Sequence, residues 1–215
     1  MPDLNSIYLS EFLTIAVVHL LAVASPGPDF AIIVRQSITY GKTTARWSSL
    51  GVGLGILIHV VYSLAGVGLI ISQSIIAFNV MKYLGAAYLI YMGIKALKAQ
   101  PENVTVDAVQ QNRQVPSTFQ AVRMGFITNG LNPKATLFFL SLFTVVIKPD
   151  TPLMIQSVYG LYLAIATGLW FTMISSIFGQ PIVRNLFKSI GHWFERTMGA
   201  ALIFLGIKLA VSSNQ

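Results

Sequence analysis

The sequence predicts an all-α integral membrane protein, because it is apolar throughout and its apolar residues form six long segments. Of the 215 residues, 54% are hydrophobic and only 10% are charged, whereas a soluble domain carries about 25% charged residues. The mean hydropathy is +0.70. Each segment is close to the length of about 20 residues that a membrane-spanning helix needs. The six segments are 12–40, 48–71, 82–97, 119–147, 153–178 and 195–211.

The first segment is interrupted near its middle by the run Ser25-Pro26-Gly27-Pro28-Asp29. Proline removes a backbone donor and clashes with the preceding helical turn, and a carboxylate at the bilayer centre costs about 2.5–3.5 kcal/mol on insertion scales. We expect Ser25 to cap a second half-helix that begins at Pro26. Asp29 then lies in the first turn, where the helix dipole favours a negative charge. The alternative is an ordinary proline kink, in which Asp29 is only a cap.

The second and third segments are expected to be uninterrupted spans. The second contains Gly51, Gly53 and Gly55, and small residues of this kind let membrane helices pack closely. Their spacing is not a nucleotide-binding signal, because no strand–turn–helix unit surrounds it. The third segment is short and ends in Lys95 and Lys98, whose aliphatic stems can reach back to the membrane interface.

The chain also contains an internal repeat. Residues 85–95, at the end of the third segment, are similar to residues 199–208, at the end of the sixth. The fourth segment is interrupted at Asn132-Pro133-Lys134, as the first is at its prolines. Three spans in each half give the halves opposite orientations, which is the inverted-repeat plan of secondary transporters. The expected parts of this single transmembrane domain are repeat one at about 8–98, a flexible cytoplasmic linker at about 99–117 and repeat two at about 118–213.

The two interruptions together predict a site for a zwitterion. Asn132 can cap a half-helix that starts at Pro133, so each break offers backbone N–H groups to a carboxylate. Asn129 lies just before the second break. We expect Asp29 and Lys134 to pair when no substrate is bound. An amino acid would replace that pair, with its ammonium on Asp29 and its carboxylate on Lys134. The alternative is that Lys134 only reaches toward the interface.

Two histidines, His19 and His59, also fall within apolar segments. A histidine that faces the interior of a helix bundle can relay protons, but a single helix–helix hydrogen bond is the favoured interpretation of each. Asp29 is the only acidic residue expected deep in a span, so it is the predicted residue for proton coupling. No metal or other cofactor is expected, because the chain has no cysteine and no metal-ligand motif.

The distribution of basic residues predicts the orientation. Ten lysines and arginines follow the first, third and fifth segments, and three lie on the other side. The positive-inside rule then places both termini in the periplasm. Because the net charge of +7 is spread over these loops, we do not expect nucleic-acid binding. Residues 1–11 contain Asp3 and Glu11 but no basic residue, so they lack the start of a secretory signal and are expected to precede a retained first span.

Several runs in the chain, taken in order, resemble one known family. They are Pro26-Gly27-Pro28-Asp29, Tyr83-Leu84-Gly85-Ala86-Ala87-Tyr88-Leu89 with Gly93, Gly125-Phe126, Asn129-Gly130 and Asn132-Pro133-Lys134. These runs, with the glycine-rich second segment, are similar to those of the LysE/RhtB family of amino-acid exporters. The resemblance covers nearly the whole chain. It implies six spans in a bacterial inner membrane and efflux of amino acids or close relatives, driven by the proton motive force.

The leading interpretation is a proton-coupled exporter of small neutral amino acids, such as homoserine, threonine or leucine, that works by alternating access. An intramembrane enzyme using Asp29 with His19 or His59 is the alternative, although it lacks a second carboxylate and a nucleophile motif. A passive channel would need a polar pore lining. Partners are the amino acid, protons and lipid, and the small-residue faces would permit a homodimer. The predicted substrate-binding residues are Ser25, Pro26, Gly27, Pro28, Asp29, Asn129, Asn132, Pro133 and Lys134.

Overall fold

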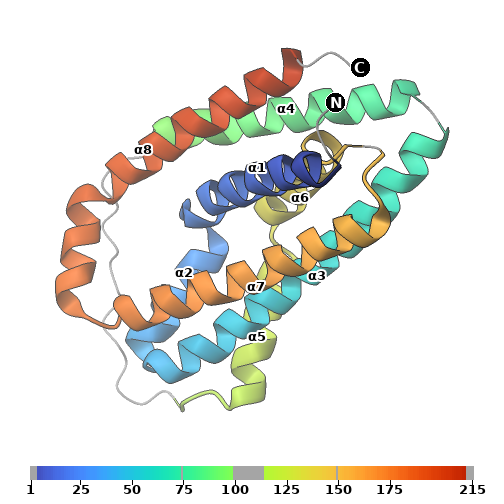
Figure 1. Ribbon diagram of the computed structural model, residues 1–215. Coiled ribbons are helices and arrows are strands. Elements are labelled where there is room, and N and C mark those ends of the chain that lie inside the picture. Colours follow the sequence, from blue (N-terminus) through green and yellow to red (C-terminus); the bar gives the residue numbers. More distant parts are fainter. Residues whose placement is uncertain (1–3, 74, 99–113, 149, 212–215) are drawn as a thin grey trace.

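The computed structural model describes residues 4–73, 75–98, 114–148 and 150–211, and every regular element in these ranges is an α-helix (Figure 1). The predicted all-α class is therefore confirmed for this part of the chain. Most of the predicted linker, 99–113, lies outside the described residues. The helices are α1 (Leu4–Ala24), α2 (Pro28–Thr39), α3 (Lys42–Gln73), α4 (Ile75–Leu97), α5 (Thr118–Gly130), α6 (Pro133–Val145), α7 (Leu153–Ile177) and α8 (Pro181–Val211).

The first predicted segment is indeed two helices, but the second of them begins later than expected. Helix α1 ends at Ala24 and α2 begins at Pro28, with the extended residue Gly27 at the N-cap position. Ser25 therefore does not cap α2, and Pro26 does not start it. The physical reason is that a residue followed by proline is pushed out of the helical conformation, so Gly27 cannot lie inside a helix that continues through Pro28. Asp29 does lie in the first turn of α2, as predicted.

The fourth predicted segment is divided into α5 and α6 at the expected place. The Asn132 side chain accepts a hydrogen bond of 3.0 Å from the backbone N–H of Lys134, and Pro133 is the first residue of α6. Both the predicted cap and the predicted helix start are confirmed. Helix α5 begins with a reciprocal capping box between Ser117 and Gln120, which satisfies two backbone donors at its start.

The predicted loop before the sixth segment is wrong. Helix α8 runs without interruption from Pro181, so Arg184, Lys188 and Arg196 belong to a helix and not to a loop. Proline is well tolerated at the first helical position, and no second proline follows it to end the helix. Figure 1 shows that α8 bends and wraps around one side of the molecule before it lies along α4. Helix α1 likewise starts before the predicted first segment and includes Glu11.

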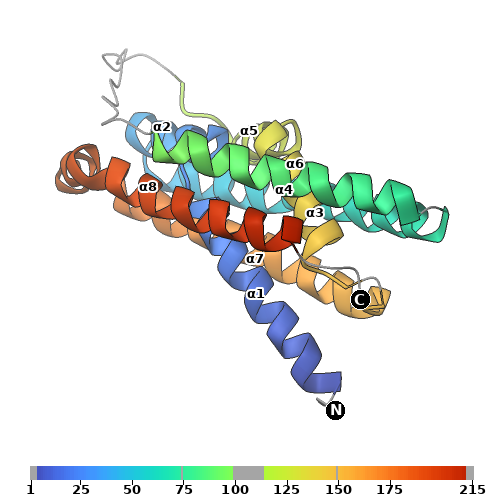
Figure 2. The same ribbon diagram turned by 90° about the horizontal axis from the view of Figure 1, so that it is seen from above.

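Glycines bring three helix pairs into backbone contact around α3 and α4. Figure 2 shows one of these pairs, α4 and α8, lying alongside each other. A Cβ atom placed on Gly51 would lie 2.0 Å from the carbonyl oxygen of Val122 on α5, and one on Gly53 would lie 3.0 Å from that of Ala164 on α7. The two similar runs of the sequence also pack on each other. A Cβ atom on Gly93 would lie 2.6 Å from the carbonyl oxygen of Gly199, and one on Gly199 would lie 2.6 Å from the carbonyl oxygen of Gly93. The close packing expected of the glycines in the second predicted segment is confirmed for Gly51 and Gly53.

Three helices in the described ranges are long and apolar enough to cross a membrane on their own: α1 over Ile7–Ala24, α3 over Lys42–Gly66 and α7 over Leu153–Ile177. A shorter apolar stretch covers Tyr83–Leu97 in α4. Large apolar side chains are exposed along these helices, among them Leu13, Val61 and Leu169. A lipid-facing surface explains such exposure, because a soluble monomer rarely shows large contiguous apolar patches.

Candidate functional site

The two helix breaks meet, and side chains from one break bind groups of the other. The Oδ2 atom of Asp29 accepts hydrogen bonds of 2.9 Å from the side-chain amides of both Asn129 and Asn132. Asn129 lies at the end of α5 and Asn132 lies between α5 and α6. The carboxylate at the start of α2 is therefore held by the second break. Hydrogen bonds to a charged acceptor of this kind are the stronger ones in proteins.

Lys134 makes the opposite connection. Its Nζ donates to the backbone carbonyl of Ser25 at 2.7 Å and to that of Pro26 at 3.4 Å. These carbonyls follow the end of α1, where unpaired oxygens and the negative end of the helix dipole favour a cation. The expected direct pair of Asp29 with Lys134 is therefore not the arrangement found, because each charge has other partners. The stem of Lys134 covers Gly27, where an added Cβ would lie 3.3 Å from its Cδ atom.

A pocket with a cavity volume of about 50 Å³ opens at this junction, which is room for a few water molecules. Seven predicted residues line it, whereas Pro26, Pro28, Pro133 and His59 are not among its lining residues. The predicted lining residues are His19, Ser25, Gly27, Asp29, Asn129, Asn132 and Lys134. The residues that were not predicted are Ala22, Val23, Phe30, Ile56, Ala135, Phe138, Phe139, Thr167 and Phe171.

Two buried acceptors at this site have no hydrogen-bond partner in the described structure. They are Oδ1 of Asp29 and Oδ1 of Asn129. A buried acceptor without a donor costs about 1–3 kcal/mol, and such atoms are rare in folded proteins. Both residues line the pocket. The site therefore offers two acceptors to a ligand that carries hydrogen-bond donors, next to a lysine and two helix N-termini that suit a negative group.

The two histidines each form a helix–helix hydrogen bond, as the favoured interpretation predicted. Nε2 of His19 and Oγ1 of Thr167 lie 2.8 Å apart and join α1 to α7. Nε2 of His59 donates to the Asn129 backbone carbonyl at 2.9 Å, and its Nδ1 lies 2.6 Å from the hydroxyl of Tyr62. Because a carbonyl can only accept, Nε2 of His59 carries the proton. His59 thus positions Asn129 from outside the pocket.

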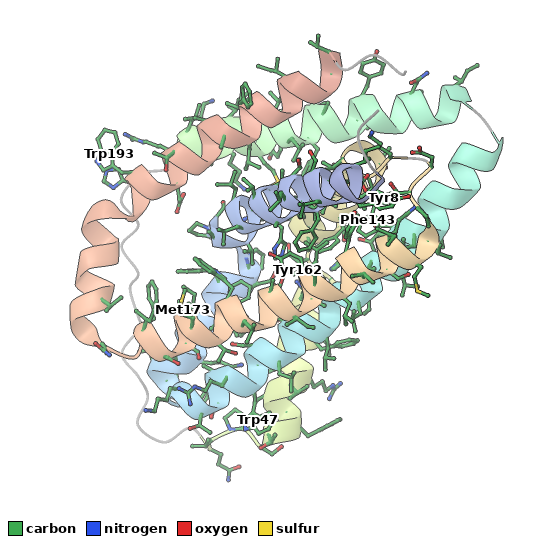
Figure 3. The ribbon with its side chains drawn as sticks, viewed as in Figure 1. Tyr8, Trp47, Phe143, Tyr162, Met173 and Trp193 are labelled. Atoms are coloured by element: carbon green, nitrogen blue, oxygen red, sulfur yellow. The ribbon has the colours of Figure 1, made fainter. Side chains whose placement is uncertain are left out.

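A second carboxylate, that of Glu11 near the start of α1, is also buried in the described structure. Glu11 is 6% exposed and accepts hydrogen bonds from the backbone N–H of Lys148 at 2.6 Å and from the Thr151 hydroxyl at 3.1 Å. The Tyr159 hydroxyl also donates to it at 3.1 Å. Figure 3 shows Tyr8, which precedes Glu11 on α1, at the end of the bundle opposite Trp47. Glu11 therefore ties α1 to α7 and to the α6–α7 connection.

The helical period of α1 could have revealed Glu11. Glu11, Ile15, Val18 and Ala22 are all buried, and their spacing of four, three and four residues places them on one helix face. Thr167, in contrast, carries no distinguishing signal in an apolar helix. In the part of the chain that the structure describes, no three His, Asp or Glu side chains gather as metal ligands would.

Comparisons with known proteins agree on the kind of protein. A family profile described as LysE type translocator matches residues 20–213. The chain is 28% identical to the threonine efflux protein of Escherichia coli (strain K12), over 95% of this chain and 99% of that protein. It is 27% identical to the threonine efflux protein of Salmonella typhi over the same shares. An uncharacterized membrane protein of Bacillus subtilis is 27% identical over 89% of this chain and 94% of its own length.

No solved structure matches this chain, so the fold has to be understood from its own helices. The family match covers most of the sequence, including both breaks, all of α2 and every pocket-lining residue except His19, which lies one residue before the matched range. Nearly all of the site described above is therefore part of the region shared with LysE type translocators. The chain belongs to the family of LysE type translocators.

Proposed function

We propose that this protein is a secondary exporter of small neutral amino acids across the bacterial inner membrane, driven by the proton motive force. The observation that carries the proposal is the pair of unpartnered acceptors, Asp29 Oδ1 and Asn129 Oδ1, beside Lys134 in one pocket. A zwitterionic amino acid has the complementary groups. The related efflux proteins of Escherichia coli and Salmonella typhi, which are named for threonine, support the substrate class.

The proposed architecture has six membrane spans arranged as two inverted repeats of three. The first and fourth spans are the broken pairs α1–α2 and α5–α6, and the others are α3, α4, α7 and α8. Two features support this arrangement. The matched breaks meet at one pocket, as in transporters with discontinuous helices. The start of α1 and the end of α8 lie toward the same end of the molecule (Figure 1), and we place both in the periplasm on the positive-inside rule.

The proposed binding mode uses both breaks. The substrate ammonium donates to Asp29 Oδ1 and Asn129 Oδ1. The substrate carboxylate accepts from Lys134, which then leaves the carbonyls of Ser25 and Pro26, and from backbone N–H groups at the helix N-termini. Among the described residues that line the pocket, only Asp29 carries a carboxylate. A cationic substrate side chain would need a second one, so the proposal is limited to neutral amino acids.

The proposed coupling makes Asp29 exchange a substrate ammonium for a proton. Both ligands neutralise the same carboxylate, so they compete, and the empty carrier returns with a proton in place of the substrate. Alternating access then arises from rocking of the two halves about the breaks. The enzyme alternative has less support, because the related proteins are named for efflux and because His19 and His59 hydrogen-bond to Thr167, Asn129 and Tyr62 and not to Asp29.

The test is uptake of labelled amino acids into inside-out vesicles, with and without an imposed proton gradient. The wild-type protein is expected to accumulate one or two small neutral amino acids in a gradient-dependent way. Failure of any amino acid to accumulate with intact protein would overturn the proposal. The chain has no cysteine, so single cysteines can be introduced beside the pocket to follow access from either side without background labelling.

The Asp29→Asn variant tests the site itself. An asparagine can turn its oxygen toward Asn129 and Asn132 and keep both hydrogen bonds, but it then presents an NH₂ group where Asp29 has its free Oδ1. A hydrogen bond to a charged group is worth about 1.5–3 kcal/mol, so apparent affinity should fall about 10- to 100-fold. The control is Asp150→Asn, which removes an exposed carboxylate. Wild-type transport by Asp29→Asn would remove Asp29 from the mechanism.

A further inference from the structure

We infer that His19 and Thr167 form a subsite that binds a hydroxyl group on the substrate side chain, so that the exported amino acids are hydroxylated ones. This inference rests on the proposed function. The two residues lie on α1 and α7 and line the same pocket as Asp29 and Lys134. His19 is 4% exposed and Thr167 is 1% exposed. They are the two polar side chains of the pocket lining that belong to neither break.

The hydrogen-bond capacity of this pair exceeds what the pair uses. A neutral imidazole has one donor and one acceptor, and a threonine hydroxyl has one donor and two lone pairs. The bond of 2.8 Å between Nε2 and Oγ1 consumes one donor and one acceptor. Whichever atom donates, one donor and at least one acceptor remain, on His19 Nδ1 and Thr167 Oγ1. A substrate hydroxyl group is itself both a donor and an acceptor, so it can hydrogen-bond to the unused acceptor and the unused donor of the pair.

Thr167 differs from most hydroxyl residues in the helices of this protein. Thr14, Thr144 and Thr172 each donate to the carbonyl four residues earlier in their own helix, which is the common way to satisfy a hydroxyl in a helix. In the described part of the chain, the hydroxyl of Thr167 has one hydrogen bond, and its partner is His19. The Thr167 hydroxyl is therefore not hydrogen-bonded to the backbone of α7, and it remains available to a ligand in the pocket.

The other residues around the pair are apolar, and this makes the pair selective for a hydroxyl group. Ala22, Ile56, Phe138, Phe139 and Phe171 surround the pocket beside it. A substrate methyl group at the pair would displace water from the unused donor and acceptor and give no hydrogen bond in return. Sites built to hydrogen-bond a substrate hydroxyl reject analogues without it for this reason.

The test compares threonine with valine, which have nearly the same shape and differ by the hydroxyl. Both are offered as labelled substrates to inside-out vesicles that hold the full-length protein, and each also competes against the other. The wild-type protein is expected to prefer threonine by about tenfold, the ratio that one hydrogen bond of about 1.4 kcal/mol supplies. Serine against alanine repeats the comparison with a smaller pair.

Three variants locate the preference. Thr167→Val should bring the threonine-to-valine ratio close to one while valine transport continues. Thr167→Ser should keep the preference, because it keeps the hydroxyl. The matched control is Thr172→Val, which removes a hydroxyl from the same helix that donates to its own backbone, to Gly168, at 2.8 Å. This control should leave the ratio at the wild-type value.

The outcomes separate the inference from the proposed function. Transport of threonine and valine at similar rates by the wild type overturns the inference and leaves the exporter proposal in place. An unchanged preference in Thr167→Val also overturns it. Transport of no amino acid by the wild type overturns the proposed function and this inference together. If Thr167→Val does not fold, the wild-type ratio and Thr167→Ser still decide the question.

Discussion

Replacing Gly51 with alanine should separate two helices that now touch through their backbones. A Cβ atom at this position would lie 2.0 Å from the carbonyl oxygen of Val122 and 2.8 Å from the backbone nitrogen of Phe126. Ordinary contacts of such atoms begin near 3.4 Å. Because the opposing atoms belong to the backbone of α5, no side-chain rotation can relieve the overlap. The two helices must move apart by more than 1 Å, or one of them must bend.

The expected cost follows from two opposing effects. Forcing an extra methyl group into a close-packed contact costs about 1–3 kcal/mol, and the rigid partner places this case at the upper end. Alanine is the better helix former by about 1 kcal/mol, which offsets part of that cost. The net loss is about 2 kcal/mol. A change of 1 kcal/mol moves the melting temperature of a protein of this length by about 2–4 °C, so we expect a fall of about 4–8 °C.

The functional consequence is larger than the loss of stability, because the same contact carries the site. Helix α5 holds Asn129, and a Cβ on Gly55, one turn after Gly51, would lie 2.7 Å from the Asn129 Oδ1 atom. A shift of α5 by 1 Å would stretch the 2.9 Å hydrogen bonds that Asn129 and Asn132 donate to Asp29. Export by Gly51→Ala should therefore fall at least tenfold at temperatures where the variant is still folded.

The assay is thermal unfolding of the purified protein in detergent, combined with vesicle transport. The control is Gly66→Ala on the same helix, where an added Cβ meets no atom within 4 Å, so this variant should melt at or above the wild-type temperature. If Gly51→Ala has the same melting temperature as Gly66→Ala and exports normally, the backbone contact between α3 and α5 is absent and the prediction is refuted.

Two further predictions test the buried charges. Glu11→Gln should lower the melting temperature by several degrees, because the donors of Lys148, Thr151 and Tyr159 lose a carboxylate acceptor and an unsatisfied buried donor costs about 1–3 kcal/mol. The control is the exposed-site variant Asp150→Asn, and equal melting temperatures for the two variants would refute this prediction. The double variant Asp29→Lys with Lys134→Asp exchanges the two charges. It should not restore the export that either single variant loses, because the two residues bind other groups and not each other. Recovery of export in the vesicle assay would show that they do pair.

The sequence is most informative about the site where local chemistry decides the structure. Prolines and glycine break the first helix at 25–27, and Asn132 with Pro133 starts α6, because these effects depend only on neighbouring residues. Which of the two prolines in the first break starts α2 was mispredicted, although the restriction on a residue before proline could have decided it. The glycines of α3 likewise predict close packing without naming the partner helix.

The partners of each charge could not be predicted, because they depend on how helices rotate about their axes. Attraction between Asp29 and Lys134 is a reasonable expectation for two opposite charges in a membrane, but it ignores competing groups. The amides of Asn129 and Asn132 reach Asp29 because α5 ends at Gly130, between these two residues, beside the start of α2. The carbonyls that follow the end of α1 attract Lys134. The position of Thr167 in the site could not be predicted for the same reason, since only tertiary packing places it beside His19.

The reciprocal arrangement of the breaks explains how binding could produce movement in the proposed cycle. The second break holds α2 through Asp29 Oδ2 and holds the end of α1 through Lys134. A substrate ammonium would use the free Oδ1 and leave the first connection intact. A substrate carboxylate on Lys134 would replace the carbonyls of Ser25 and Pro26 and release the second connection. Binding would therefore release the link between Lys134 and the end of α1 while the link through Asp29 stays in place, and α1 would then be held by Glu11 and His19, which bind groups of α7 and of the α6–α7 connection.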